Sequence, residues 1–157
     1  MSELNVTREL NCPYHLARGY LSQDVANRSA SGKATRITLS ALLPGIALHK
    51  DVDVTFAKGA DPMHFDEPWK LQWKPAGGGP YPDFQGELTV RAGEDYPVAI
   101  LELVGSYAPP GGAAGAAFDA VAGNRIAVAT AQRLLKELGD EMEARYRREE
   151  DDKRTRV

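Results

Sequence analysis

The sequence predicts an α+β protein in which an antiparallel β-sheet is followed by one long C-terminal helix. Apolar residues alternate with period two along most of the chain up to Tyr107, which is typical of strands with one buried face. After the Pro-Gly-rich junction at 109–112, apolar residues recur every three or four positions, as in an amphipathic helix. Such a helix has to bury its apolar stripe, and the preceding sheet offers the surface for it.

Length and composition indicate one globular domain. The 157 residues suffice for a hydrophobic core, and contents of 43% apolar and 26% charged residues are ordinary for a globular protein. A net charge of -3 and an isoelectric point near 5.6 argue against a nucleic-acid partner, because contacts with phosphates require a basic surface.

The sequence also bears on the cellular compartment. Cys12 is the only cysteine, so no internal disulfide can form, which fits a reducing environment. No apolar run approaches the roughly 20 residues of a membrane-spanning helix, so we expect no stable membrane insertion. The first residues lack the charged and apolar regions of a secretion signal. We therefore expect a cytoplasmic protein.

The first part of the chain predicts a strand, a short helix and a β-hairpin. Pro13 suits the first turn of a helix, and Tyr14, Ala17, Leu21 and Val25 follow at helical spacing. Two alternating segments then flank a Pro-Gly pair, which is the pattern of a hairpin. The predicted bounds are 3–10 for the strand, 13–27 for the helix, 27–33 for a turn, and 35–43 and 47–57 for the hairpin strands.

The second part predicts three more strands and the long helix. Alternation indicates strands at 69–74, 84–91 and 96–107, and the last should be the longest strand. The helical pattern extends from Ala113 to about Arg148, and Gly123-Asn124 should divide it, with the main piece starting near Asn124. We therefore expect a single domain over residues 1–146 and a charged, disordered tail over 147–157.

A meander of strands that curls around one helix rarely fills the space beneath it, so the pattern suggests a ligand cavity. Its lining would be apolar, with indole N–H groups and a tyrosine hydroxyl as polar tips. The alternative is that these side chains pack a filled core, and periodicity alone leaves both interpretations open. The candidate lining residues are Phe56, Trp69, Leu71, Trp73, Phe84, Leu101, Leu103, Tyr107 and Phe118.

Trp73 and three segments carry a resemblance to a known family; the segments are Phe84-Gln85-Gly86-Glu87-Leu88, Gly105-Ser106-Tyr107-Ala108-Pro109-Pro110-Gly111 and Asn124-Arg125-Ile126-Ala127-Val128-Ala129-Thr130. With the order of strand, helix, meander and long helix, they make residues 3–146 resemble the START/Bet v1-like superfamily, also called SRPBCC or helix-grip proteins. The segments look similar to those of bacterial members of unassigned function. The resemblance implies a helix-grip fold, in which a curved antiparallel sheet wraps around the long C-terminal helix.

The resemblance implies binding or carriage of a hydrophobic small molecule or lipid in the cavity between sheet and helix. A minority of members are polyketide cyclases or dehydratases, so an enzyme of that kind is the alternative function. The family has no universal catalytic motif, so it supplies no catalytic residue, and we expect no cofactor. The usual pair of short helices after the first strand is hard to place in this chain. The oligomeric state stays open, a homodimer included.

Three polar features could carry further chemistry. His49, Asp51 and Asp53 share a strand face, but neighbours on one face lie about 6.5–7 Å apart, so a solvated face fits better than a metal site. His64 lies among acidic residues in a polar segment, where an ordinary loop is the simpler interpretation. Arg125 on the long helix either binds an anionic head group of the ligand or forms a surface salt bridge.

Overall fold

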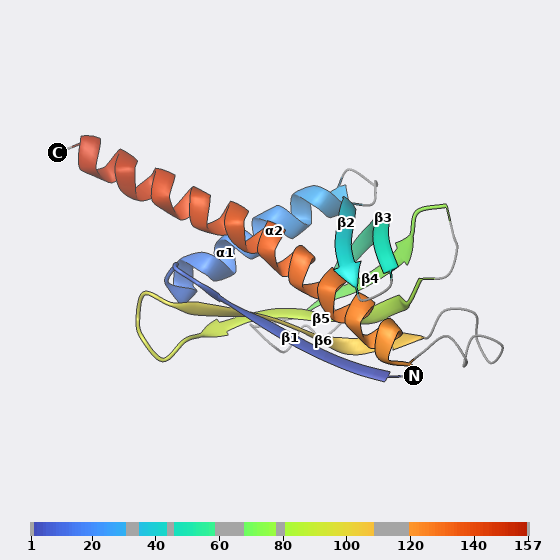
Figure 1. Ribbon diagram of the computed structural model, residues 1–157. Coiled ribbons are helices and arrows are strands. Elements are labelled where there is room, and N and C mark those ends of the chain that lie inside the picture. The colour runs from blue at the N-terminus through green and yellow to red at the C-terminus, as the bar shows by residue number, and fades with distance from the viewer. Residues whose placement is uncertain are drawn as a thin grey trace.

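The computed structural model describes residues 2–30, 35–43, 46–58, 68–77, 81–108 and 120–156 (Figure 1). The described part combines a single six-stranded sheet with two helices. The elements in chain order are β1 (Ser2–Leu10), α1 (Tyr14–Ala30), β2 (Thr35–Leu43), β3 (Ile46–Lys58), β4 (Trp69–Pro75), β5 (Asp83–Ala92), β6 (Ala99–Ala108) and α2 (Ala120–Thr155).

The sheet is antiparallel throughout and open, with the strand order β1-β6-β5-β4-β3-β2. Strands β2 to β6 are neighbours in the order of the chain, while β1 pairs with β6 and so extends the sheet on its far side. The register places Val6 beside Leu103, which in turn lies beside Leu88. The side chains of these three residues point to the same face and form a continuous apolar row across the sheet.

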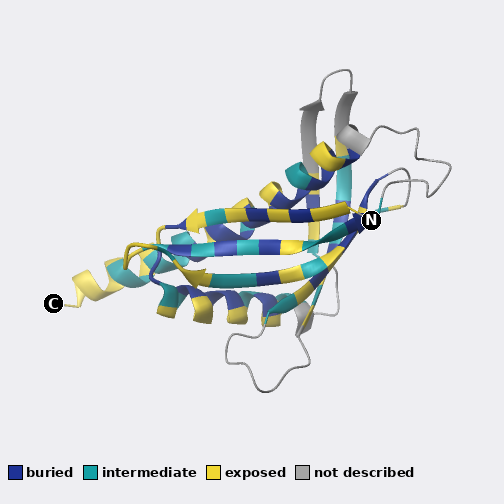
Figure 2. Ribbon diagram, turned by 90° about the horizontal axis from the view of Figure 1, so that it is seen from below, coloured by how far each residue is buried: buried dark blue, intermediate teal, exposed yellow. Residues whose placement is uncertain are grey.

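The two helices lie on the same face of the sheet, and the opposite face carries most of the exposed strand positions (Figures 1 and 2). Helix α2 has its main contacts with the edge strand β1, with its neighbour β6, and with the other edge strand β2. Helix α1 packs against α2 and against β3, β5 and β6. The single hydrophobic core lies between the helices and this face of the sheet.

The prediction for the first helix is confirmed, and α1 extends further than expected. Ala17, Leu21 and Val25 are buried at their helical spacing. The carbonyl oxygen of Pro13 accepts hydrogen bonds from the amides of Leu16 and Ala17, which closes the first turn. The helix runs through Ala30, so residues 27–30 of the turn predicted at 27–33 are helical, and the rest of that prediction lies outside the described residues. One helix of 17 residues connects β1 to β2.

Two predictions about the strands need correction. The longest strand is β3 with 13 residues, whereas β6 has only 10 and begins at Ala99. The preceding residues form a turn, because the amide of Gly93 donates to the carbonyl of Val98 and the amide of Val98 donates to Asp95. The strand predicted at 96–107 therefore started too early, because its first residues belong to the turn that joins β5 to β6.

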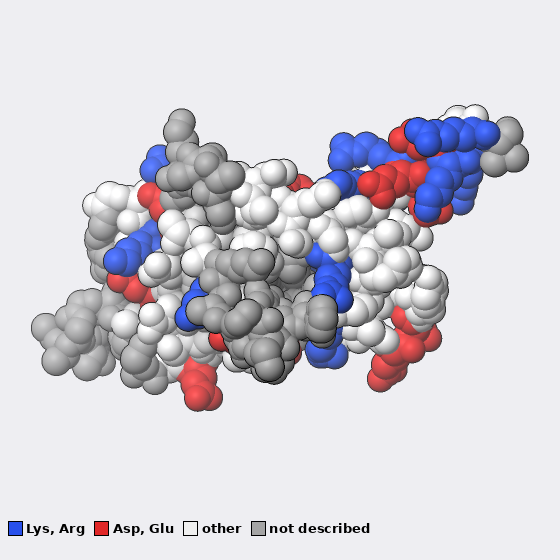
Figure 3. Space-filling view, turned by 180° about the vertical axis from the view of Figure 1, so that it is seen from behind, with Lys and Arg blue, Asp and Glu red and all other residues white. Residues whose placement is uncertain are grey.

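The long helix also differs from its prediction at two places. Helix α2 continues without a break through Gly123 and Asn124, because a single glycine weakens a helix by only about 1 kcal/mol. It also continues to Thr155, although we expected a disordered tail from residue 147. Its last turns project beyond the sheet and interleave both signs of charge (Figures 1 and 3). Pairs such as Lys153 with Glu150 at 3.3 Å lie at helical spacing on this segment.

Arg8 and Gly139 form the joint between β1 and α2. The Arg8 guanidinium donates to the backbone carbonyls of Leu135 and Lys136 and pairs with Asp140 at 2.6 Å. A Cβ on Gly139 would lie 2.6 Å from the Arg8 guanidinium, so glycine permits this close approach. These bonds hold the middle of α2 on the edge of the sheet.

Candidate functional site

Six of the ten predicted site residues lie together in the core rather than around a cavity. Each of these six retains at most 3% of its accessible surface, and Trp73 retains none. A side chain that borders a void large enough for water keeps accessible surface towards it, so this part of the inner face is filled. The six are Leu71, Trp73, Phe84, Leu101, Leu103 and Tyr107.

Two of the polar tips expected to orient a ligand, those of Trp73 and Tyr107, are used within the protein. The Trp73 indole stacks on Phe84 with ring centroids 4.2 Å apart, and its N–H donates to the carbonyl of Pro82 at 3.0 Å. The Tyr107 hydroxyl accepts a hydrogen bond from the Asn124 side chain at 3.1 Å. These bonds connect the sheet to the loop before β5 and to the start of α2.

The other four predicted residues lie elsewhere. Phe56 on β3 and Trp69 on β4 are half-buried and pack against the edge of the core. Arg125 is exposed on α2, so it does not join the buried group, and Phe118 lies outside the described residues. The part of the predicted site that a ligand could still reach is therefore centred on Phe56 and Trp69.

Tyr81 and Thr130 form a buried polar contact that the sequence did not suggest. Their hydroxyl groups are hydrogen-bonded to each other, and the Thr130 hydroxyl also donates to the carbonyl of Ile126 at 2.7 Å. Burial raises the pKa of Tyr81 to about 12, so its proton stays on the hydroxyl at physiological pH. The pair lies between α2 and the segment before β5, and the aromatic ring fills space beneath the helix.

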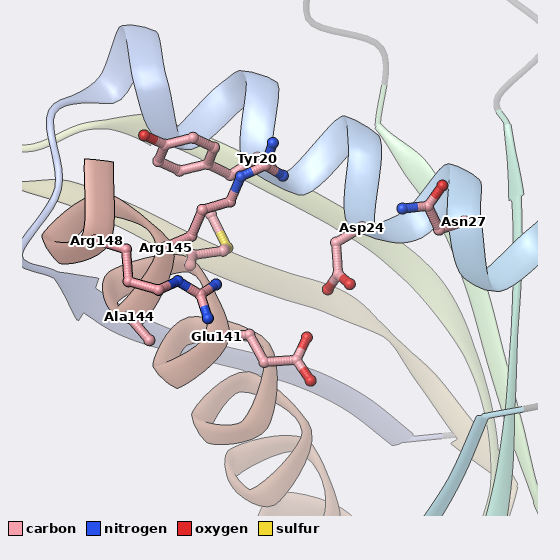
Figure 4. A pocket seen from close by; sticks show the side chains of 8 residues that line it. Tyr20, Asp24, Asn27, Glu141, Ala144, Arg145 and Arg148 are labelled. Atoms are coloured by element: carbon pink, nitrogen blue, oxygen red, sulfur yellow. The ribbon is translucent and has the colours of Figure 1, made fainter. Parts of the chain in front are cut away.

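A groove of about 280 Å³ opens between the two helices (Figure 4). Tyr20, Asp24 and Asn27 line it from α1, while α2 contributes residues from Glu141 to Arg148. The acidic side chains Asp24 and Glu141 point towards each other from opposite helices, and the two arginines, Arg145 and Arg148, lie towards the other end of the groove (Figure 4). We call it the interhelical groove.

Arg28 connects the two acidic side chains of the interhelical groove. Its guanidinium bonds to Asp24 at 3.4 Å and to Glu141 at 2.9 Å. The second carboxylate oxygen of Asp24, Oδ2, is buried and has no hydrogen-bond donor. Burial raises the pKa of Asp24, with a further contribution from the Glu141 carboxylate, while Arg28 acts in the opposite direction.

Tyr20 lies at the basic end of the same groove. Its hydroxyl is hydrogen-bonded to Glu149, and the Arg145 guanidinium lies 4.9 Å from the centre of its ring. Cys12 is buried nearby, and burial, with the charges of Glu143 and Glu149, raises its pKa to about 11. A thiol in that state is a poor nucleophile, so the cysteine is a core residue.

The outer face of the sheet carries a second, larger hollow of about 540 Å³. Outward-facing polar side chains such as Gln72, Gln85 and Ser106 line it together with apolar residues, among them Leu71. The aromatic residues of the predicted site do not supply its walls, apart from Phe56.

The predicted solvated face on β3 agrees with the structure. His49 is exposed, Asp53 pairs with Arg36 at 3.0 Å, and Asp51 accepts a hydrogen bond from Thr38 at 2.8 Å. No group of three metal-ligating side chains occurs among the described residues. His64 and its acidic neighbours lie outside the described part of the chain.

Comparisons with known proteins were made by sequence and by structure. No protein-family model and no curated protein matches the sequence. A crystal structure of an uncharacterized protein from Bacillus thuringiensis is similar, with 12% identity over 90% of this chain and 98% of that chain and a TM-score of 0.49. That likeness names no ligand or activity. Within the described residues, neither helix combines the length and apolar character of a membrane-spanning segment.

Proposed function

We propose that this protein binds a hydrophobic small molecule or lipid between its sheet and α2, in a helix-grip arrangement like that of the START/Bet v1-like superfamily. The observation that carries the proposal is that α2 contacts both edge strands, β1 and β2. Six strands laid flat span about 24 Å, which is wider than one helix, and Figure 1 shows β2 and β3 steeply inclined to β1, β5 and β6 and rising beside α2. A sheet that bends around the helix accounts for both contacts.

The distribution of helix contacts supports this arrangement. The inner strands β3 and β5 pack mainly against α1, while α2 packs mainly against β1 and, to a lesser extent, against β2 and β6. A concave sheet leaves more depth beneath α2 at its centre than at its edges. Large aromatic side chains such as Trp73 and Tyr81 take up part of that depth. A ligand would occupy the remainder, beside the half-buried Phe56 and Trp69.

Burial of apolar surface would supply most of the affinity, at about 25 cal/mol per Å². The described inner face offers few ionisable groups for catalysis, since Arg8 is engaged with α2 and the Tyr81 hydroxyl keeps its proton. No observation therefore favours the cyclase or dehydratase alternative over simple binding.

A fluorescence titration with the apolar dye anilinonaphthalene sulfonate tests this function. The Trp73→Phe variant leaves Trp69 as the only indole, so energy transfer from Trp69 to the dye reports binding beside it. We expect saturable transfer from Trp69. Trp69→Ala lacks this energy donor, so its affinity is read from the emission of the directly excited dye, and we expect it to be about tenfold or more weaker. The control is Tyr96→Ala, which removes an aromatic ring that is 76% exposed. Equal affinity in Trp69→Ala and Tyr96→Ala would contradict the proposed site.

A further inference from the structure

The interhelical groove has two ends of opposite charge, and each end has an unsatisfied group. Asp24 Oδ2 is buried without a donor at the acidic end. At the basic end, Arg148 lines the groove and has no ion-pair partner among the residues that the structure describes. The two groups come from different helices, and Figure 4 shows the groove between them.

The acidic end favours a cationic donor. Asp24 and Glu141 place two carboxyl groups at this end, and Arg28 is the one described cation that bonds to both. A buried carboxylate oxygen without a hydrogen bond destabilises the folded protein, and the cost is greater when the group is charged. A protonated amine supplies three N–H donors and one positive charge, so it would satisfy Oδ2 and balance the second carboxylate.

The basic end favours an anion. Arg145 is engaged with the Tyr20 ring and lies 3.6 Å from Glu149, which leaves Arg148 as the available guanidinium. A guanidinium binds a carboxylate or phosphate through two parallel hydrogen bonds. Met142 also lines the groove and, with the ring of Tyr20 at the basic end, provides apolar surface for a short hydrocarbon chain.

We propose that the interhelical groove binds a small zwitterion, with a primary ammonium at Asp24 and Glu141 and a carboxylate or phosphate at Arg148. Seven residues separate Glu141 from Arg148, which is about 10 Å along a helix. The arginine side chain leans back towards the helix N-terminus and shortens that span. The matching ligand is therefore an ω-amino acid with several methylene groups, rather than an α-amino acid. This site is separate from the hydrophobic one beneath α2.

A titration followed by the backbone amide NMR signals of the full-length protein tests this inference. The probes are ε-aminocaproate, γ-aminobutyrate and glycine, with caproate and hexylamine as analogues that each keep one charged end. We expect ε-aminocaproate to bind most tightly and to shift signals from both walls of the groove, at Tyr20 and Asp24 in α1 and at Glu141 and Arg148 in α2. Caproate and hexylamine should each bind at least about tenfold more weakly than ε-aminocaproate.

Two pairs of matched variants assign the ends. Asp24→Asn and Arg148→Gln should each lower the affinity for ε-aminocaproate about tenfold, whereas Asp95→Asn and Arg147→Gln, both at exposed positions, should leave it unchanged. Arg148 is exposed, so Arg148→Gln tests the anionic end independently of the change at Asp24. No shift with ε-aminocaproate, equal binding of hexylamine, or full affinity in Arg148→Gln would overturn the inference.

Discussion

At the scale of single residues, the two tryptophans have different environments although both alternate inward. Trp73 is fully buried, stacks on Phe84 and donates to Pro82, whereas Trp69 is only half-buried. The sequence places both on one strand face but cannot distinguish them, because burial depends on which residues of distant elements cover each position. Trp73 is therefore a core residue, and Trp69 is the better candidate for contact with a ligand.

We expect Trp73→Ala to lower the free energy of unfolding by about 3–5 kcal/mol, because it leaves a large cavity in a filled core. Trp69→Ala should cost clearly less, because its ring already has solvent on one side. Urea melts of the two variants and the unmodified protein measure the difference. A small loss for Trp73→Ala would mean that Trp73 borders an empty space, contrary to its complete burial.

Asp24 makes the stability dependent on pH. Its raised pKa means that the folded protein holds the proton more tightly than the unfolded chain does. The stabilising contribution of Asp24 is therefore present below its unfolded pKa and is lost as the pH rises through the raised pKa. Asparagine resembles the neutral acid, so Asp24→Asn should be more stable than the unmodified protein at neutral pH.

The difference between Asp24→Asn and the unmodified protein should shrink as the pH falls towards the unfolded pKa. Thermal melts at a series of pH values measure it, with Asp95→Asn as the control at an exposed site. A variant that is less stable than the unmodified protein at neutral pH would show that the bond to Arg28 outweighs the burial of Asp24.

At the scale of elements, α1 and α2 show where sequence patterns succeed and where they fail. The helical spacing of apolar residues correctly predicted the buried face of α1, because this helix is stabilised mainly by apolar contacts with the sheet. The last turns of α2 have no apolar stripe, and their helical form is supported by pairs such as Arg145 with Glu149 and Lys153 with Glu150. The spacing of opposite charges is the signal that could have predicted it.

The glycines of α2 give a matched test of its packing. At Gly139 a Cβ would lie 2.6 Å from the Arg8 guanidinium and 2.8 Å from the Leu10 side chain, while at Gly123 no described atom lies within 4 Å. Gly139→Ala should therefore displace Arg8 and lower the free energy of unfolding by about 1–3 kcal/mol. Gly123→Ala should raise it by up to about 1 kcal/mol, because alanine favours helix.

Gly19→Ala in α1 provides the control for helix propensity alone, since Gly19 is exposed and has no neighbour within 4 Å. In denaturant melts, Gly123→Ala and Gly19→Ala should have similar free energies of unfolding, and that of Gly139→Ala should be clearly lower. If all three variants are equally stable, Arg8 does not hold α2 against β1 in the way described.

At the scale of the whole molecule, the order and pairing of the strands were largely predictable, whereas the interhelical groove was not. The α+β layout of a sheet followed by a long helix is confirmed in the described residues, since local alternation and turn residues specify neighbouring antiparallel strands. At the groove, Arg28 bonds to Glu141, which lies 113 positions away in the sequence, and no local sequence pattern connects the two residues. Contacts between helices follow from the completed fold.

The open sheet and its covering helices also explain why the predicted cavity is only partly supported. Inward alternation identified the correct face for Leu101 and Leu103, both fully buried. Alternation does not determine whether facing side chains meet or leave a space, because that depends on side-chain volumes across the whole core. The half-buried Phe56 and Trp69 mark the part of that face where a ligand remains possible.

Native mass spectrometry of the purified protein, after incubation with a bacterial lipid extract, tests the proposed binding of a hydrophobic ligand most directly. The proposal predicts one bound apolar molecule per chain, which organic extraction releases and identifies. Trp69→Ala should retain clearly less of it, whereas Tyr96→Ala should retain as much as the unmodified protein. An unmodified protein that stays free of any adduct after exposure to the extract would contradict the proposed function.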